Sequence, residues 1–480
     1  MKGVTAHIPE IAGLGVKTVY LMPIWDHAER QNPRQHYIYI INDYYRIAPE
    51  FGTEKDLKEL VDAVHRNGMR IVFDLVTTAA AATGSVPAKN NWLLAMPVAE
   101  LRERAKALGW ELKSGTFEGA DYIYSSDVHP EKAGSAGALL GHVAARVDGD
   151  RAIIHCFPWA HWGPAIDKTN PEVIDYFAKV AGYYVKEYGI DGWRVDAPQD
   201  NWNRALFPGN RSSMPMMRKI RQTVTAAKPD AILFAEGAFL SAPPGTDVLK
   251  LIASGQTPGD LEPVLDEFCE ISYSYYFNRR LARVLRAGVS GDGTATRELL
   301  DAISSELVRY DRPRARFLEI HDTGRAAPVA SDNLKALATL IVTVPGVPMI
   351  QVGQERGAAN KFDWSSNTAV DFKSGDELRQ FYKKLFQMRS GSGALKYGTI
   401  ETAWVSGNAL LAYRRKFEKQ RVVVAINLTD KQGAGVLDVS PAAKGAVFQD
   451  LLSGEKIAVE QPGRLNVTVA AHGSRILVAM

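Results

Sequence analysis

Apolar residues in the first part of the chain occur at two spacings, one typical of helices and one typical of buried strands. Residues 4–14 carry apolar side chains three and four positions apart, and residues 16–22 form a short apolar run that ends at Pro23. The same order returns with a predicted helix over 54–67 and a predicted strand over 70–75. Strands that are apolar on both faces and alternate with helices are typical of a parallel sheet covered by helices.

The alternation resumes after residue 165 and continues to about residue 390. Helices are predicted over 171–188, 214–227, 296–309, 331–342 and 375–389. Strands are predicted over 192–195, 231–235, 267–272, 315–320 and 348–352, which makes seven with the two earlier ones. The pattern therefore predicts an α/β protein with a parallel sheet or barrel.

Two regions do not follow this alternation. Residues 77–165 are too long for a loop of a compact barrel, so we interpret them as an inserted domain. From residue 396 to residue 480 the apolar runs are short, partly alternating and separated by turn residues, which predicts an antiparallel β-sandwich. The predicted barrel domain then comprises residues 1–76 and 166–392.

Composition and charge narrow the class of protein. A formal net charge of +3 over 480 residues gives no case for nucleic acid or a membrane surface as a partner. No apolar run reaches the roughly 18 residues that a membrane-spanning helix needs. The chain starts without the basic and apolar regions of a signal peptide, and a native N-terminus upstream of Met1, and with it secretion, stays open. Cys156 and Cys269 have no metal-ligand spacing and are expected to be buried thiols, with a single disulfide as the alternative.

The residues between Gly189 and Asp196 carry the first candidate chemistry. Arg194 and Asp196 are two positions apart on a predicted strand, so their side chains share a face. A guanidinium beside a carboxylate keeps that carboxylate ionised at neutral pH. Asp196 is therefore a candidate nucleophile, and an ordinary ion pair at a strand end is the alternative.

Acidic residues follow other predicted strands as well. Asp74, Glu236 and Asp322 lie at or near the carboxyl ends of theirs, and the carboxyl ends of parallel barrel strands meet at one face. Glycoside cleavage needs one ionised carboxylate and one protonated carboxyl group. Glu236 follows an apolar strand, where desolvation favours the protonated form. The set therefore predicts a site for glycoside chemistry.

Three of these stretches resemble motifs of the α-amylase family, the retaining (β/α)8-barrel glycosidases and transglycosylases that act on α-glucosides. Residues 192–196 are similar to its nucleophile motif, residues 234–236 to its acid/base strand, and residues 317–322 to its transition-state-stabiliser motif. The resemblance extends over nearly the whole chain. It implies a TIM barrel, identifies residues 77–165 as the family's domain B and identifies residues 396–480 as its domain C.

The resemblance also implies a reaction and a partner. Asp196 would be the nucleophile, Glu236 the general acid/base and Asp322 the stabiliser of a double displacement on an α-linked oligosaccharide or polysaccharide. A retaining mechanism predicts that the carboxyl groups of Asp196 and Glu236 lie roughly 5–5.5 Å apart. The expected activity is hydrolysis of α-glucosidic bonds. A transglycosylase of the same family and a non-catalytic carbohydrate-binding homologue are the alternatives.

Four further residues are expected at the site by the same resemblance. Arg194 and His321 would contact the nucleophile and the sugar hydroxyls. Tyr39 would stack on the sugar at the cleaved bond, and Asp74 matches the aspartate of the family's third-strand motif.

The chain also departs from the family pattern. Thr78 stands where an asparagine often helps to bind a structural calcium ion, and Ala79 stands where a histidine binds a sugar hydroxyl. Gln199 and Asp200 replace a Lys-His pair. These departures favour a divergent subfamily. No cofactor is predicted, and the calcium site is in doubt because a hard cation needs several oxygen ligands together.

The first barrel strand of the family has no counterpart here, since the chain begins in the helix predicted near Val4. A parallel barrel that lacks one strand exposes two unpaired edges. We therefore expect that residues precede Met1, or that the barrel is open or completed by a partner chain.

Overall fold

The structure is a computed structural model. It describes residues 1–27, 37–81, 90–117, 119–126, 143–155, 163–198, 206, 213–236, 267–287, 294–309, 312–360, 370–406 and 410–480, and the structural statements below concern these residues. The chain forms two compact units. The first comprises Met1–Ala12, Val16–Ser272 and Asp363–Asn367, and the second comprises Gly13–Gly15, Tyr273–Phe362 and Thr368–Met480. Each unit is described by itself.

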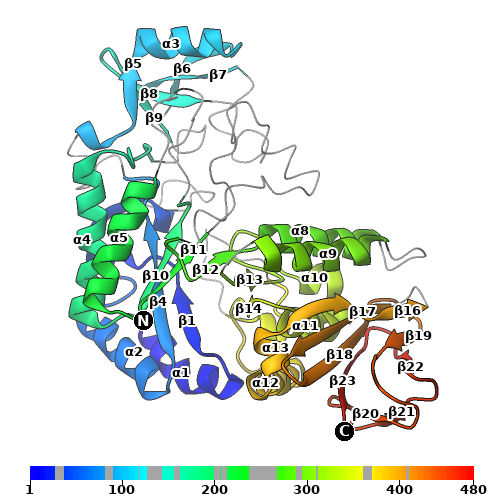
Figure 1. The fold of residues 1–480 in the computed structure, drawn as a ribbon. Coiled ribbons are helices and arrows are strands. Elements are labelled where there is room, and N and C mark those ends of the chain that lie inside the picture. The colour runs from blue at the N-terminus through cyan, green and yellow to red at the C-terminus, as the bar shows by residue number, and fades with distance from the viewer. Residues whose placement is uncertain are drawn as a thin grey trace. The chain divides into compact units, whose positions relative to one another are not determined.

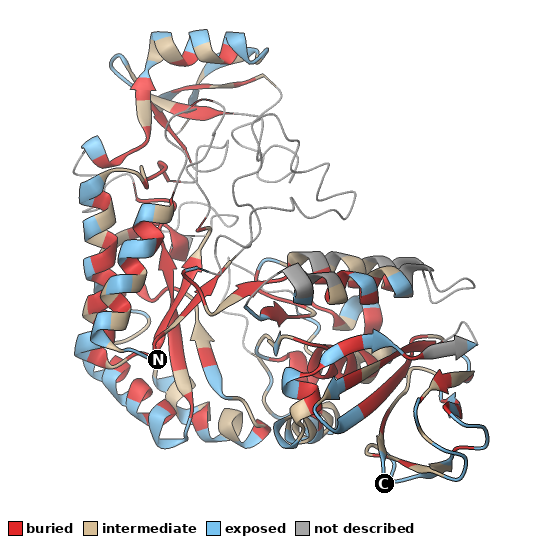
Figure 2. Ribbon diagram, viewed as in Figure 1, coloured by how far each residue is buried: buried red, intermediate tan, exposed pale blue. Residues whose placement is uncertain are grey.

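The first unit is built on five parallel strands that follow one another in chain order. They are β1 (Thr18–Leu21), β4 (Arg70–Val76), β10 (Gly192–Asp196), β11 (Ile232–Ala235) and β12 (Ile271–Tyr273). The helices are α1 (Lys2–Leu14), α2 (Glu54–Arg66), α4 (Pro171–Tyr188) and α5 (Met214–Ala227). Figure 1 shows α2, α4 and α5 along the outside of these strands. Their apolar faces and the strands share one buried core, as the red segments in Figure 2 indicate.

The chain between α4 and β10 is fixed by two glycines. Asn170 caps the start of α4 by accepting a hydrogen bond from the Glu172 N–H, and Gly189 ends the helix with a φ of 72°. Gly192 opens β10 with a φ of 143°, and a Cβ there would lie 1.8 Å from the Ile232 carbonyl oxygen. Only glycine fits so close to a neighbouring strand at such a φ, so Gly192 sets the distance between β10 and β11.

The predicted inserted domain contains an antiparallel sheet with its own core. Its strands are β5 (Ala95–Pro97), β6 (Leu112–Phe117), β7 (Ala120–Ser125), β8 (Ala144–Asp148) and β9 (Arg151–Ile154), in the order β5-β9-β8-β7-β6. Helix α3 (Val98–Ala107) supplies Leu101 and Ala105 to that core. An antiparallel pair of β2 (Trp25–His27) and β3 (Ile41–Ile47) follows β1, and the unit also contains the 3-10 turns η1 (Tyr37–Tyr39) and η2 (Asn90–Trp92).

The second unit contains two more parallel strands, β13 (Arg314–Arg316) and β14 (Val347–Pro348). Its helices are α8 (Tyr275–Ala287), α9 (Thr294–Arg309), α10 (Ala327–Ala330), α11 (Leu334–Thr343), α12 (Asp376–Gly391) and α13 (Gly393–Tyr397), with the 3-10 turns η4 (Ser331–Asn333) and η5 (Gln354–Arg356).

The predicted C-terminal β-domain is confirmed, and it consists of two antiparallel sheets. The larger sheet has the order β15 (Thr399–Thr402), β17 (Leu410–Phe417), β18 (Gln420–Asn427), β23 (Ser474–Ala479), β20 (Val447–Asp450) and β21 (Lys456–Ala458). The smaller sheet has the order β16 (Trp404–Ser406), β19 (Gly433–Asp438) and β22 (Arg464–Val469).

Seven parallel strands of a TIM-type half-barrel are therefore present, as predicted. Five of the seven are shorter than predicted, and two of these end well before the predicted residue. The strand expected over 315–320 ends at Arg316, because the Ile320 N–H donates to the Thr323 hydroxyl at 2.9 Å and thereby forms a turn. The strand expected over 348–352 is confined to Val347 and Pro348. Among the described residues, no helix combines the length and apolarity that a membrane crossing requires.

A buried polar cluster joins the amino-terminal ends of β4 and β10. Asp191 is 3% exposed, and its carboxylate accepts hydrogen bonds from the His65 ring at 2.8 Å, from the Ile71 N–H at 2.8 Å and from the Lys228 ammonium. Burial alone would raise the pKa of Asp191, but these donors outweigh it and hold the pKa below its usual value.

Asp191→Asn is expected to lower the free energy of unfolding by about 3 kcal/mol at pH 7, because the Lys228 ammonium loses its buried carboxylate partner. The lowered pKa of Asp191 means that its contribution is present above about pH 4 and is lost as the pH falls through the folded-state value. Urea unfolding from pH 7 to pH 2 should show a weaker acid dependence in the variant. Asp230→Asn is the control, since this exposed partner of Arg70 should change stability by less than about 1 kcal/mol. Equal losses in both variants would contradict the assignment.

Candidate active site

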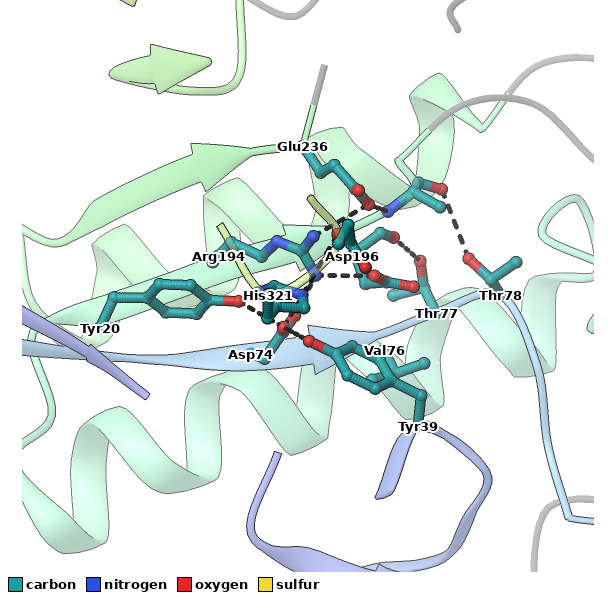
Figure 3. A network of polar contacts seen from close by, with 12 residues as sticks. Tyr20, Tyr39, Asp74, Val76, Thr77, Thr78, Arg194, Asp196, Glu236 and His321 are labelled. Atoms are coloured by element: carbon teal, nitrogen blue, oxygen red, sulfur yellow. Dashed lines mark hydrogen bonds and ion pairs between the residues drawn. The ribbon is translucent and has the colours of Figure 1, made fainter. Parts of the chain in front are cut away.

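The Arg194 side chain is fully buried and contacts three carboxylates. Its Nη1 donates to the two oxygens of Asp74 at 2.9 and 2.7 Å and to Oδ1 of Asp196 at 2.6 Å. Its Nη2 lies 3.0 Å from Oε2 of Glu236. Figure 3 shows these carboxylates around the guanidinium. The predicted pairing of Arg194 with Asp196 is confirmed, and the structure adds Asp74 and Glu236 to it.

Strand register explains why these residues meet. β10 lies between β4 and β11, and Arg194 is paired with Asp74 on one side and with Phe234 on the other. Residues paired across parallel strands point to the same face, and Asp196 returns to that face two positions later. Glu236 follows the last residue of β11, and its N–H donates to the Val195 carbonyl at 3.1 Å. Asp74 lies two residues before the last residue of β4, near the carboxyl end as predicted.

Asp74 is the innermost carboxylate of the three. Its side chain has no exposed surface, and it accepts hydrogen bonds from the Tyr20 hydroxyl at 2.7 Å and from the Tyr39 hydroxyl at 2.8 Å. Burial raises the pKa of Asp74, while the charge of Arg194 and these hydrogen bonds act in the opposite direction. Asp74 thus links Arg194 to Tyr39, the tyrosine expected to stack on the sugar. Tyr39 is 5% exposed.

Asp196 and Glu236 are the two carboxylates of this group that solvent reaches. Each side chain is 17% exposed. Glu236 accepts the Ala197 N–H at 2.9 Å in addition to its contact with Arg194. Glu236 is therefore held in this structure as an ion-pair partner of Arg194.

His321 and Asp322 lie in the second unit, in the turn after β13. The His321 Nε2 is 3.3 Å from Oδ2 of Asp322, and the Asp322 side chain is 34% exposed. A buried ion pair supports this turn, with Arg325 Nη1 2.6 Å from Oε1 of Glu319. The other oxygen of Glu319 accepts the Ala326 N–H at 2.6 Å. Sequence reasoning missed this pair, and the signal available was a glutamate inside an apolar run.

Comparison with known proteins adds independent information. The family described as "Alpha amylase, catalytic domain" matches residues 1–85, and the family described as "Maltogenic Amylase, C-terminal domain" matches residues 402–476. A cyclomaltodextrinase from Thermoanaerobacter pseudethanolicus is 25% identical over 446 residues, which cover 90% of this chain and 64% of that protein. Neopullulanase 2 from Thermoactinomyces vulgaris is 25% identical over 484 residues, which cover 99% of this chain and 70% of that protein. The chain thus spans about two thirds of the length of these curated relatives.

The fold agrees with these matches. The α-amylase from Geobacillus thermoleovorans, solved as a complex with acarbose, aligns with a TM-score of 0.70 at 21% identity and covers 100% of this chain and 92% of its own. The chain is therefore similar to α-amylase family proteins over most of its length, and it has the α-amylase fold. This fold comprises a half-barrel of seven parallel strands, an inserted antiparallel sheet and a C-terminal antiparallel β-domain.

The departures from the α-amylase family pattern have local structural explanations. Ala79 is 1% exposed and pairs with Ala165 in an isolated bridge. A Cβ on Gly163 would lie 2.0 Å from the Ala80 carbonyl oxygen. The two chain segments that connect the barrel to the inserted sheet therefore run too close for large side chains. The Thr78 hydroxyl lies 3.4 Å from the Ala197 carbonyl oxygen.

Among the described residues, no group of three or more His, Cys, Asp and Glu side chains is arranged to hold a metal ion. Trp92 is a core residue, 4% exposed, whose indole N–H donates to Glu172. Gln199, Asp200 and Cys156 lie outside the described residues.

Arg194→Met is expected to lower the free energy of unfolding by about 3–5 kcal/mol at pH 7, because the buried Asp74 loses its cation. Without Arg194 the burial of Asp74 raises its pKa further, so the protonated form is favoured in the folded protein and the deficit should shrink as the pH falls from 7 towards 5. Chemical denaturation at both pH values measures this. Arg70→Met, which removes an exposed ion pair, is the control and should cost less than about 1 kcal/mol. A deficit that does not change with pH would contradict the role given to Asp74.

Proposed function

We propose that this protein is a retaining glycoside hydrolase that cleaves α-glucosidic bonds of α-glucans or their oligosaccharides. The observation that carries the proposal is that two accessible carboxylates, Asp196 and Glu236, contact the two terminal nitrogens of one buried guanidinium at 2.6 and 3.0 Å. A pair of neighbouring carboxyl groups is the minimum equipment for glycoside hydrolysis with retention.

The proposed reaction has two steps. A carboxylate oxygen of Asp196 attacks the anomeric carbon while Glu236 gives its proton to the departing glycosidic oxygen, and a glycosyl ester forms on Asp196. Glu236, now ionised, takes a proton from water as the water oxygen attacks the anomeric carbon and Asp196 leaves. Asp322 is proposed to stabilise the positive charge that develops on the sugar ring, in accordance with its place in the family motif.

Arg194 has different tasks toward the two carboxylates. Its contact with Asp196 keeps the nucleophile ionised, which the first step needs. Its contact with Glu236 engages the carboxyl group that must reach the glycosidic oxygen in the same step. We therefore expect the bound substrate to displace Glu236 from Arg194. The glycosidic oxygen of the substrate then accepts the proton of Glu236.

The substrate class is proposed from the relatives. They include cyclomaltodextrinases, a neopullulanase and a maltogenic α-amylase, and one solved relative binds acarbose and another maltose. The transglycosylase alternative has support from a cyclomaltodextrin glucanotransferase of Geobacillus stearothermophilus, which is 23% identical over 441 residues. The changes at Thr78 and Ala79 motivate the third alternative, a carbohydrate-binding homologue without activity.

Substitution of the nucleophile should separate an enzyme from a binding protein. Asp196→Ala should lower kcat on an aryl α-glucoside or a maltooligosaccharide by at least about 10³-fold, since the covalent intermediate no longer forms. Asp175→Ala on the exposed side of α4 is the control and should retain the wild-type rate. Equal rates for the wild type and Asp196→Ala would exclude the catalytic assignment. A product screen over maltose, isomaltose, trehalose, sucrose, maltooligosaccharides, pullulan and cyclomaltodextrins, with and without added maltose as an acceptor, identifies the substrate and detects transfer.

The anomeric form of the first product tests the mechanism itself. A double displacement through Asp196 should release the α-anomer, which proton magnetic resonance detects before mutarotation. The carboxyl groups of Asp196 and Glu236 should then lie roughly 5–5.5 Å apart in a substrate complex. Release of the β-anomer, or a separation in the roughly 6.5–9.5 Å range of inverting enzymes, would refute the proposed mechanism.

A further inference from the structure

Lys168 lies at the junction of the inserted sheet and the barrel and is 1% exposed. Its ammonium donates to the carbonyl oxygen of Ala197 at 2.7 Å, one residue beyond the proposed nucleophile. Lysine is almost never fully buried without partners, because removing its charge from water carries a large cost in free energy. The contact with the Ala197 carbonyl is one of the interactions that hold this ammonium in the interior.

Ala197 has a backbone conformation that needs support. Its φ is 38°, in the left-handed region that residues other than glycine seldom occupy. Such a conformation costs on the order of 1–3 kcal/mol and persists where the surroundings fix it. The Ala197 N–H donates to Glu236 at 2.9 Å, and its carbonyl receives Lys168 at 2.7 Å and the Thr78 hydroxyl at 3.4 Å.

The peptide groups on either side are also held. The Thr77 hydroxyl lies 3.5 Å from the Asp196 carbonyl oxygen, and the Ser213 hydroxyl donates to the Pro198 carbonyl at 2.6 Å. We call residues Asp196, Ala197 and Pro198 the catalytic turn. Figure 3 shows Thr77 and Thr78 directed at this turn from the end of β4.

Lys168 itself is fixed by its neighbours in sequence. The Ile166 N–H donates to the Thr78 carbonyl at 3.0 Å, and the Asp167 N–H donates to the Trp92 carbonyl at 2.9 Å. Asp167 accepts the Thr169 N–H at 3.0 Å. It does not cap α4, since Asn170 does so. The ammonium is therefore presented to the catalytic turn from a rigid segment.

We infer that Lys168 is a positioning residue whose ammonium holds the catalytic turn in place of a structural metal ion. The assignment of Asp196 as the nucleophile rests on the proposed function, whereas the contact of Lys168 with the turn does not. Lys168 touches a backbone carbonyl next to the nucleophile, so its effect on the reaction is exerted through the placement of Asp196. A misplacement of about 1 Å can cost about 10²-fold in rate.

The calcium ion that the family resemblance implies does not fit these residues. A calcium ion takes six to eight oxygen ligands, whereas Thr78 replaces the usual asparagine. The Ala197 carbonyl beside Thr78 already accepts a hydrogen bond from a positively charged ammonium, which would repel a second cation. The carboxylates of Asp74, Asp196 and Glu236 already contact the Arg194 guanidinium.

Lys168→Met is the decisive variant, because methionine fills a similar volume without the charge or the donor. Lys179→Met on the exposed side of α4 is the matched control. Hydrogen exchange at the Ala197 amide, measured by mass spectrometry on the full chain, should become at least about tenfold faster in Lys168→Met and remain unchanged in Lys179→Met. This measurement does not depend on activity, so it stays informative if the wild type turns over no glucan.

Kinetics and metal analysis complete the test. On a substrate that the wild type cleaves, Lys168→Met should lower kcat by about 10²-fold with KM within about twofold, since Lys168 holds the turn and not the sugar. Wild-type protein should contain well under about one calcium ion per chain, and a chelator should leave Ala197 exchange unchanged. If Lys168→Met fails to fold, Thr78→Val should show a smaller acceleration of the same exchange.

Two outcomes would overturn the inference. One is unchanged exchange at Ala197 in the folded lysine variant, or in Thr78→Val where the lysine variant does not fold. The other is a bound calcium ion in the wild type whose removal accelerates that exchange. Accelerated exchange together with an inactive wild type would leave the role of Lys168 in place and reject the proposed hydrolase.

Discussion

The arrangement of the first unit around its site depends on one buried cation. Arg194 has no exposed side-chain surface and contacts Asp74, Asp196 and Glu236. A single positive charge cannot fully compensate three carboxylates, so the group tends to carry an excess of negative charge. That excess suits the chemistry proposed for it, because the transition state of glycoside cleavage resembles an oxocarbenium ion and is positively charged. Carboxylates that are fixed before the reaction stabilise such a charge without reorganising.

This arrangement constrains the strands around it. Asp74 and Arg194 meet because β4 and β10 are paired in that register, and Glu236 joins them because β11 ends beside β10. A shift of one residue in either pairing would turn these side chains to the other face. Gly192 sets the approach of β10 to β11, and Asp191 ties the start of β10 to β4 through the Ile71 N–H. Gly192 and Asp191, at the amino-terminal end of β10, thus help to fix the register that brings the carboxylates to Arg194 near the carboxyl end.

Much of this could be predicted from local patterns. Apolar periodicity located α4 and α5, and the spacing of Arg194 and Asp196 predicted their ion pair. The failures have a physical cause. The run 317–320 is apolar because its loop is buried, and periodicity alone does not separate a buried loop from a strand. Lys168 and Thr78 both contact the Ala197 carbonyl, although the three residues are distant in sequence. No local sequence pattern therefore predicts these contacts.

The residues that depart from the family pattern and those that follow it serve different physical purposes. A nucleophile and a general acid must supply particular atoms at particular positions, so Asp196 and Glu236 have few chemical substitutes in the roles proposed for them. A strained backbone turn requires only that its peptide groups be satisfied and its carbonyls face positive charge. An ammonium such as that of Lys168 can meet this requirement as well as a metal ion can, and a threonine hydroxyl adds a second donor. Support for the turn can therefore change while the carboxylates stay the same.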